Sequence, residues 1–506
     1  MSVVAKVLTA APIGFEGRII EVESDTTKGL PSLQIVGMGS KAIDEAKERV
    51  KSAIANSLLE YPARRITINL APAEIPKDGT HYDLPIALAV LASSGQIRQE
   101  ELDSAAFAGE LALDGTVRPI RGAIAIAEAA QLRGLTHLYV PIANVEQAKL
   151  IKNIEIIGVE SLKSLFLHLK KELVIATPAA TDASAKPKHT THHSHGPELD
   201  DMYGQEQAKR ALIIAASGPH NILFTGPPGA GKTMLARTLA GLLPPLQDDE
   251  QVVLTKLYSL AGETTEEAVT ARPFRSPHHT SSRVALVGGG TNPRPGDISL
   301  AHLGVLFLDE LPEYPRSSLE ALRQPLEDKY VSISRANGHF MFPADFMLAA
   351  TMNPCPCGYY GDATHECTCS SLQIANYQKR LSGPLLDRID MIVPVSRVPH
   401  SFLLKSDTTL KGQHKHAQES IKRVRNIQLN RYKNSLKNNG NITNKDIKKH
   451  AALAEDAHNL LETASKKLDL SARRYFKTIK VARTIADLDS SDQITTTHIS
   501  EALQYR

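Results

Sequence analysis

The chain has 506 residues, of which 42% are hydrophobic and 22% charged, and this length predicts two to four globular domains. No run approaches the roughly 20 apolar residues that span a bilayer, and the first residues lack the apolar core of a signal peptide, so we expect a cytoplasmic protein. The formal net charge is only +3, but residues 401–506 hold 20 Lys and Arg against 11 Asp and Glu, which permits a phosphate-rich partner and equally a solvated helical face.

The first 175 residues predict a separate α+β domain. Apolar runs at 65–72 and 137–144 favour strands, whereas 41–57 and 83–95 have the spacing of helices. His81 and Asp83 stand where the chain enters the second of these helices, and we expect a structural turn there rather than chemistry.

Residues 176–197 predict a flexible tether, because they are rich in Ala, Thr, Ser and Pro and show no apolar period. This tether contains a group of histidines, namely His189, His192, His193 and His195. A solvated linker is favoured over a weak metal site for them.

The run NILFTGPPGAGKT at 221–233 predicts a phosphate-binding loop between a buried strand and a helix. The loop matches G-x-x-x-x-G-K-[ST], and we expect all its residues around the phosphates of ATP: Gly226, Pro227, Pro228, Gly229, Ala230, Gly231, Lys232 and Thr233. The glycines let backbone amides face a polyphosphate. Lys232 would reach the β- and γ-phosphates, and the Thr233 hydroxyl would ligate Mg²⁺.

A second nucleotide motif, GVLFLDE at 304–310, reads as an apolar strand that ends in two acids. Asp309 suits Mg²⁺ through water, and Glu310 suits the polarisation of the attacking water. Two carboxylates at the end of a buried strand carry a desolvation cost, which favours a binding or catalytic role for them. The alternative is a strand that simply ends at a charged turn.

A cationic stretch rich in Gly and Pro lies between the two motifs, at 272–297. Its basic residues are Arg272, Arg275, His278, His279, Arg283 and Arg294. If the chain forms a ring ATPase, an insertion at this place faces the central pore, where these side chains would grip phosphates; contacts to a nucleotide or between subunits are the alternative. The hairpin at 328–342, with Asn337 and Gly338 at its turn, is a second candidate pore element.

The four cysteines of the chain form two C-x-C pairs, Cys355 with Cys357 and Cys367 with Cys369. Four thiols across one loop can hold a tetrahedral Zn²⁺, although this spacing is tighter than the usual C-x₂-C. Structural zinc is favoured over free thiols or a redox role. The loop follows an apolar strand that ends at Asn353, so the metal would fix its position.

From about residue 398 the chain predicts basic amphipathic helices, interrupted by the cluster NNGN at 438–441. A late helix opens with Ser471, Ala472 and Arg473.

In this order, the phosphate loop, the strand ending in DE and the strand FMLAATMN ending at Asn353 resemble an AAA+ ATPase. The resemblance implies that Asn353 orients the hydrolytic water and that Arg388, in PLLDRID at 384–390, is an arginine finger. It also implies that Arg473 reaches the γ-phosphate from a helical lid, with Arg474 as the less favoured candidate.

Finer stretches at 272–282, 296–310 and 321–328 are similar to the magnesium-chelatase-related branch of AAA+ proteins. Within it, the similarity to bacterial competence members covers nearly the whole chain. The resemblance implies an α/β multidomain protein. Its parts are a Lon-protease-like, ribosomal-S5-like α+β domain at 1–175, a linker at 176–197, an AAA+ core at 198–397 with the Cys-rich loop 355–369, and a helical lid at 398–506.

The Lon-like resemblance rests on Lys77-Asp78-Gly79 and on residues 109–130. Aligned on these stretches, His81 replaces the nucleophilic Ser of the protease and Ile124 replaces its Lys. A dyad without nucleophile and base cannot perform covalent catalysis. We therefore expect a platform for assembly or for partner contact.

The family resemblance implies a homohexameric ATP-dependent DNA motor. Its activity would be branch migration on single-stranded or branched DNA, promoting integration of DNA in natural transformation or recombination, with a recombinase as a further partner. The alternative is a chelatase-like remodeller that acts on a protein client. A protease is excluded by the missing dyad.

Overall fold

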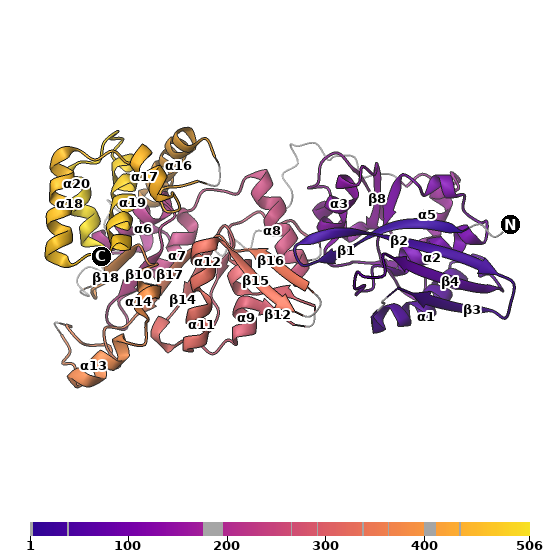
Figure 1. Cartoon of the computed structure of the whole chain (residues 1–506), viewed down its shortest axis with the longest axis horizontal. Coiled ribbons are helices and arrows are strands. Elements are labelled where there is room, and N and C mark those ends of the chain that lie inside the picture. Colours follow the sequence, from indigo (N-terminus) through magenta and orange to yellow (C-terminus); the bar gives the residue numbers. More distant parts are fainter. Residues whose placement is uncertain are drawn as a thin grey trace.

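The computed structural model describes residues 4–37, 40–175, 196–264, 266–290, 292–335, 338–362, 364–398, 411–434 and 437–506. The linker histidines His189, His192, His193 and His195 and the hairpin residue Asn337 lie outside these ranges. The chain forms two lobes side by side, with the amino-terminal module at one end and the remaining elements at the other (Figure 1). No helix in the described ranges is both long and apolar enough to cross a membrane.

The amino-terminal module, residues 4–175, is built on a seven-stranded sheet in the order β3-β4-β2-β1-β5-β8-β9. Its strands are β1 Ala5–Ile13, β2 Glu16–Thr27, β3 Ser32–Val36, β4 Arg65–Ala71, β5 Ala105–Phe107, β8 His137–Pro141 and β9 Glu155–Val159, with the short pair β6 Glu110–Leu111 and β7 Val117–Arg118 beside them. Its helices are α1 Lys41–Asn56, α2 Asp83–Ser93, α3 Ala123–Leu132, α4 Val145–Ala148 and α5 Leu162–Leu169. Residues alternate between buried and accessible along β4, as period-two patterning predicts.

The predicted turn before the second helix of this module is confirmed, because α2 begins at Asp83. The buried Asp83 carboxylate accepts a hydrogen bond from Arg49 Nε at 2.7 Å. His81 is buried, and its Nε2 has no hydrogen-bond partner within the described ranges. Ile124, in α3, is also fully buried. Neither His81 nor Ile124 therefore lies where a substrate could reach it.

The second lobe contains a five-stranded parallel sheet in the order β11-β14-β17-β10-β18. These strands are β10 Ile222–Thr225, β11 Phe274–Arg275, β14 Val305–Leu308, β17 Met347–Met352 and β18 Met391–Pro394. The helices are α6 Glu206–Ser217, α7 Lys232–Leu242, α8 Asp248–Ala261, α9 Arg283–Val287, α10 Asp297–Leu300, α11 Arg316–Ala321, α12 Arg323–Asp328, α13 Ser371–Gln378 and α14 Gly383–Leu386. Two small ribbons accompany them, β12 Gly288–Gly289 with β13 Arg294–Pro295, and β15 Tyr330–Arg335 with β16 Gly338–Pro343. All five strands run the same way, so their carboxyl ends meet at one edge of the sheet.

The carboxy-terminal region is helical, as predicted, and shares one apolar core with a face of the parallel sheet. Its helices are α16 Gln413–Tyr432, α17 Asn444–His450, α18 Glu455–Leu468, α19 Ala472–Leu488 and α20 Thr496–Gln504. Asp487 in α19 pairs with Arg483 at 2.9 Å and with Arg431 of α16 at 2.5 Å, which balances the buried charges. The predicted interruption of the helices is confirmed, since residues 438–441 lie between α16 and α17.

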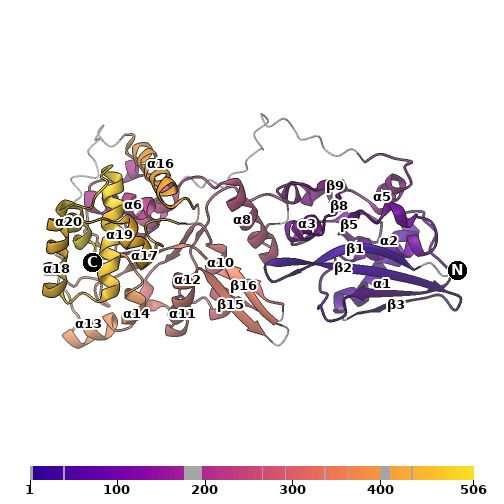
Figure 2. The same cartoon turned by 45° about the horizontal axis from the view of Figure 1, so that its top comes forward.

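The two lobes touch where α3 and the β1–β2 turn meet α8 (Figure 2). The amide of Gly122 donates to Ser259 Oγ at 3.0 Å. Lys256 of α8 pairs with Glu128 of α3, and its ammonium lies 4.3 Å from the centre of the Phe15 ring. These contacts fix α8, an element of the second lobe, against the amino-terminal module.

Candidate active site

The phosphate loop follows β10 and leads directly into α7, as predicted. Gly229 and Gly231 adopt φ of 76° and 84°, which glycine reaches without steric strain. Lys232 is the first residue of α7, so the loop amides and the start of this helix face the same space. Gln205 holds the loop from outside by donating to the carbonyl of Ala230 at 2.7 Å.

The ammonium of Lys232 lies under the loop. It donates to the carbonyls of Gly226 at 2.5 Å and Pro227 at 3.0 Å, and to Asn353 Oδ1 at 2.9 Å. Burial lowers the pKa of Lys232, while the nearby Asp309 carboxylate opposes this shift. The structure thus brings Lys232 and Asn353, which are 121 positions apart in the sequence, into direct contact.

The two acids at the end of β14 have different surroundings. Asp309 accepts hydrogen bonds from Thr351 at 2.5 Å and from Thr233 Oγ1 at 3.4 Å. Glu310 is exposed, and its backbone amide donates to Thr351 Oγ1 at 2.9 Å. The Thr233 hydroxyl and the Asp309 carboxylate are hard oxygen donors that suit Mg²⁺, which would neutralise charge on the β- and γ-phosphates. The exposed carboxylate of Glu310 suits a general base.

The two arginines expected to act on the nucleotide lie elsewhere. The carbonyl of Arg388 accepts a hydrogen bond from Asn221 Nδ2 at 3.0 Å, and Asn221 immediately precedes β10. Arg473 and Arg388 both pair with Glu327 of α12. Both arginines are therefore at the amino-terminal edge of the sheet, opposite the phosphate loop of the same chain, and Arg473 does not face that loop.

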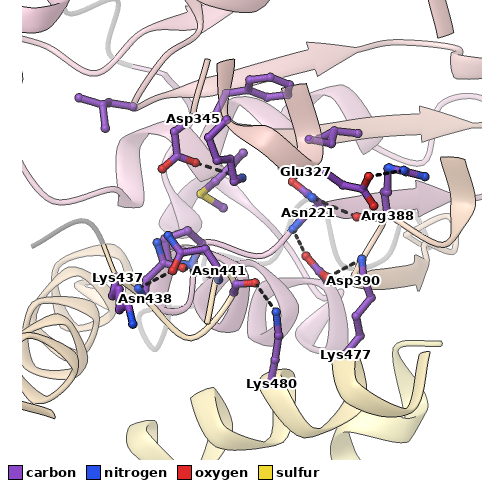
Figure 3. A pocket seen from close by; sticks show the side chains of 18 of the residues that line it. Asn221, Glu327, Asp345, Arg388, Asp390, Lys437, Asn438, Asn441, Lys477 and Lys480 are labelled. Atoms are coloured by element: carbon purple, nitrogen blue, oxygen red, sulfur yellow. Dashed lines mark hydrogen bonds and ion pairs between the residues drawn. The ribbon is translucent and has the colours of Figure 1, made fainter. Parts of the chain in front are cut away.

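A pocket of about 730 Å³ opens at this amino-terminal edge, between the sheet and the helical region (Figure 3). Its charged lining includes Arg388, Arg473, Lys477 and Lys480, and Lys477 pairs with the buried Asp390 at 2.7 Å. Burial lowers the pKa of Lys480, whose ammonium donates to the carbonyl of Gly440 at 3.2 Å. The lining of the pocket contains more cationic than acidic side chains.

The four cysteines converge. The sulfur of Cys355 lies 3.3 Å from that of Cys357 and 3.7 Å from that of Cys367, and Cys357 lies 3.6 Å from Cys367. The ligand atoms of the four, Cys369 included, lie within 4.8 Å of one another. Sulfurs placed about 2.3 Å from one tetrahedral Zn²⁺ are about 3.8 Å apart. The cluster is therefore compatible with a zinc site.

The cysteine loop lies against the phosphate loop. Gly358 has φ of 88°, and a Cβ at this position would meet Pro228 Cδ at 2.7 Å. Arg397, just after β18, joins the two loops, because its guanidinium donates to the Pro228 carbonyl at 3.2 and 3.3 Å and lies 5.4 Å from the ring centre of Tyr359. The fixed shape of one loop thus supports the other.

The basic residues expected in a pore divide into two groups. Arg272 is 14% exposed and donates to the carbonyls of Pro244 and Leu303 at 2.5 and 2.7 Å, and Arg275 pairs with Asp297 at 2.6 Å. These two arginines are committed to partners within the chain. In contrast, His278, Arg283 and Arg294 are exposed and His279 is half-buried.

The predicted hairpin is formed by β15 and β16, and it lies beside the exposed part of the cationic stretch. A methyl group at Gly289 would lie 3.1 Å from Arg335 Nη2 and 3.4 Å from Val284. Arg335 and His339 of the hairpin are exposed. The structure therefore brings the two candidate pore elements together on one surface.

Several residues that contribute to the site are not identified by any sequence motif. Thr351 stands two positions before Asn353 and joins Asp309 to the backbone of Glu310. Arg397 contacts Pro228, which is 169 positions away, and Glu327 contacts arginines that are at least 61 positions away. No local motif indicates either residue. Of these three residues, only Thr351 offered a signal in the sequence, because its hydroxyl lies two positions before Asn353.

We predict that Gly358→Ala raises the KM for ATP roughly tenfold, because the added methyl overpacks the contact with Pro228. ATPase kinetics and binding of a fluorescent ATP analogue measure this effect. Gly361→Ala is the matched control, since Gly361 also has a left-handed φ of 79° but nothing lies within 4 Å of its Cβ position. Equal effects of the two substitutions would show that backbone strain alone, and not the loop contact, matters.

Comparisons with known proteins agree with this geometry. Models of the magnesium chelatase subunit ChlI match residues 22–144 and 198–403, and a model of its carboxy-terminal part matches residues 413–506. The competence protein ComM of Haemophilus influenzae is 43% identical over 99% of this chain and 97% of its own length. The YifB proteins of Salmonella typhimurium and Escherichia coli are each 42% identical, over 99% and 98% of this chain and 97% and 96% of their own. The chain therefore belongs to the ComM/YifB family of magnesium-chelatase-related AAA+ proteins, a family that implies binding of ATP and Mg²⁺.

Proposed function

We propose that this protein is a ring-forming ATPase that drives DNA branch migration and so promotes integration of DNA in natural transformation or recombination. The observation that carries the proposal is the division of the catalytic groups between two edges of one sheet. Lys232 and Glu310 are at the carboxyl edge, and Arg388 and Arg473 are at the amino-terminal edge. A complete site then requires two copies of the chain.

The division leads to a closed ring. Each copy would offer its phosphate loop to one neighbour and its arginines to the other, which is a head-to-tail contact. Such contacts form a ring when the rotation between copies closes, and we propose six copies. The amino-terminal module, proposed to be Lon-like without proteolytic activity, would stand beside α8 and the hairpin in each copy.

Hydrolysis in this site would divide the work among named side chains. Glu310 takes a proton from a water molecule that Asn353 orients, and the water oxygen attacks the γ-phosphorus. The bond from the γ-phosphorus to the bridging oxygen breaks, and ADP leaves with that oxygen. Lys232 holds the β- and γ-phosphates, and Arg388 of a neighbouring copy stabilises the charge of the transition state.

The support for DNA as the partner comes from the exposed cations and from one relative. His278 and Arg283 of the cationic stretch are exposed, as are Arg335 and His339 of the hairpin, and contact with phosphates needs such exposed donors. Gly289 of the cationic stretch lies beside Arg335 of the hairpin. Arg272 and Arg275 would place this surface rather than touch DNA. The relative in Haemophilus influenzae is named a competence protein. A recombinase is a further proposed partner.

A second candidate is a chelatase-like remodeller that acts on a protein client. Three models of the magnesium chelatase subunit ChlI match this chain, and that similarity favours the alternative. It would use the same ATP site. The response of the ATPase to DNA separates the two functions.

The cysteine cluster is proposed to hold a structural Zn²⁺. The sulfur spacing fits a tetrahedral ion, and the loop it would fix lies against Pro228 and close to Asn353. The ion would preserve the shape of the nucleotide site and take no part in hydrolysis.

We predict that single-stranded DNA or a four-way junction stimulates the ATPase of the assembled protein several-fold at low salt. The rate is measured without DNA and with single-stranded, duplex and four-way DNA, and Glu310→Gln should abolish it in each case. Arg283→Ala should raise the DNA concentration for half-maximal stimulation, whereas Arg133→Ala, an exposed arginine of the amino-terminal module, should not. A rate that no DNA changes would favour the protein client.

We predict that two inactive variants restore activity when mixed. Lys232→Ala lacks the phosphate-loop lysine, and Arg388→Ala lacks the arginine finger. An interface is therefore intact when the Arg388→Ala copy supplies the phosphate loop and the Lys232→Ala copy supplies the arginine finger. In a random ring from equal amounts, about a quarter of the interfaces are of this kind, and about a quarter of the ATPase rate should return. A mixture of Lys232→Ala with Glu310→Gln stays inactive, because both defects affect the same half of the site. Absence of recovery in the first mixture would refute the shared site.

We predict one zinc ion per chain by elemental analysis, and its loss in Cys357→Ser. Removing the ion should lower the unfolding temperature and weaken ATP binding, since the loop against Pro228 loses its support. Thr368→Ala, between the last two cysteines, should keep both zinc and ATP binding. A zinc-free wild-type protein with unchanged ATP affinity would contradict the proposal.

A further inference from the structure

We propose that Glu327 is the residue that holds Arg388 and Arg473 in a free subunit, and that the terminal phosphate of a nucleotide on a neighbouring copy displaces it. This inference rests on the shared ATP site proposed above. It adds a positioning residue that sets how readily the two arginines engage a neighbour.

Glu327 lies near the end of α12 and divides its carboxylate between the two arginines. Its Oε2 lies 2.7 Å from Arg388 Nη2, and its Oε1 pairs with Arg473 Nη2. Figure 3 shows the pair that Glu327 forms with Arg388 at the rim of the pocket. Each arginine thus contacts one oxygen of the same anion. A terminal phosphate that binds both guanidinium groups would require the same arrangement. The carboxylate thus stands where a phosphate would bind.

The orientation of Arg388 does not depend on Glu327 alone. Its Nε donates to the carbonyl of Arg323 at 3.2 Å, and its Nη1 donates to the carbonyl of Pro384 at 2.6 Å. Loss of the carboxylate would therefore free Nη2 while the other two nitrogens keep the group in place. An arginine that remains oriented can accept a new anion at small entropic cost.

The charge of Arg388 makes an anion necessary at this position. The side chain is only 9% exposed, and burial lowers the pKa of its guanidinium. A guanidinium nevertheless stays protonated in proteins, and a buried cation without a partner is strongly unfavourable. Asp387, Glu320 and Asp328 also favour the charged form from nearby, but Glu327 is the carboxylate that forms an ion pair with Arg388 in the described ranges. An incoming phosphate would therefore compete with Glu327 for the same nitrogen.

Arg473 depends on Glu327 more directly. It is the second residue of α19, and its side chain is 45% exposed. In the described part of the chain, the ion pair found for Arg473 is the one with Glu327. The carboxylate therefore holds a partly exposed arginine of the helical region beside Arg388 of the core.

The competition predicts the effect of a neutral isostere. Glu327→Gln keeps the size of the side chain and removes its charge, so a neighbour's phosphate no longer has to displace an anion. The ATP concentration for half-maximal assembly should fall about three- to tenfold, the range expected for two partly exposed ion pairs. The kcat of the assembled ring should stay within about twofold, because the carbonyls still orient Arg388.

Assembly is measured by light scattering with increasing ATP in full-length protein that carries Glu310→Gln, which blocks hydrolysis. The KM and kcat for ATP are measured in protein with Glu310 intact. Glu320→Gln is the matched control, because Glu320 has a similar exposure of 35% and pairs with Arg323 rather than with Arg388 or Arg473. Glu327→Ala provides a second test, and thermal unfolding checks that each variant is folded.

A fall in the ATP midpoint for Glu327→Gln, with none for Glu320→Gln, supports the inference. An unchanged midpoint, or a lower kcat with unchanged KM, overturns it and leaves Glu327 as a structural partner. Arg388→Ala tests the shared site separately: full ATPase in this variant would refute the proposed function, whatever Glu327 does. Failure of the Glu310→Gln parent to assemble with ATP would overturn both.

Discussion

The direction of the strands in the five-stranded parallel sheet governs the rest of the structure. Because β10, β14 and β17 end at one edge, Lys232, Asp309 and Asn353 meet there although 121 positions separate the first from the last. The same direction places the residues that precede β10 and β18 at the other edge, and Arg388 lies among them. A single chain can therefore build only half of the proposed site at each edge.

How much of the site the sequence predicts follows from where each contact lies along the chain. The phosphate loop, the two acids and Asn353 occur at strand ends within short motifs, so their positions could be predicted and the structure places them together. The position of Arg473 could not be predicted, because it depends on how α19 packs on the sheet through a core drawn from distant segments. The sequence predicted that a helix opens at Ser471, which caps α19 in the structure, but it did not predict the direction of this helix.

The loops around the nucleotide site show a second limit of local patterns. The spacing of the cysteines predicts a metal, and the convergence of their sulfurs agrees with this. What the spacing does not predict is the contact of the same loop with Pro228, or the bridge that Arg397 makes between the two loops. The first contact depends on β17 lying beside β10 and the second on β18 lying beside β10, and both pairings are properties of the whole sheet.

The contacts between the lobes connect the amino-terminal module to α8 and to the hairpin, so movement of one subunit against its neighbour would affect all three. Glu128 and Phe15 of the amino-terminal module hold Lys256 of α8, while the β1–β2 turn lies against Phe340 of the hairpin. The hairpin in turn lies beside the exposed part of the cationic stretch. A rotation of one subunit against its neighbour, as the arginines engage a phosphate, would move these elements together with the amino-terminal module. The module thus supports the surface proposed to contact DNA, and this role requires no catalysis from His81.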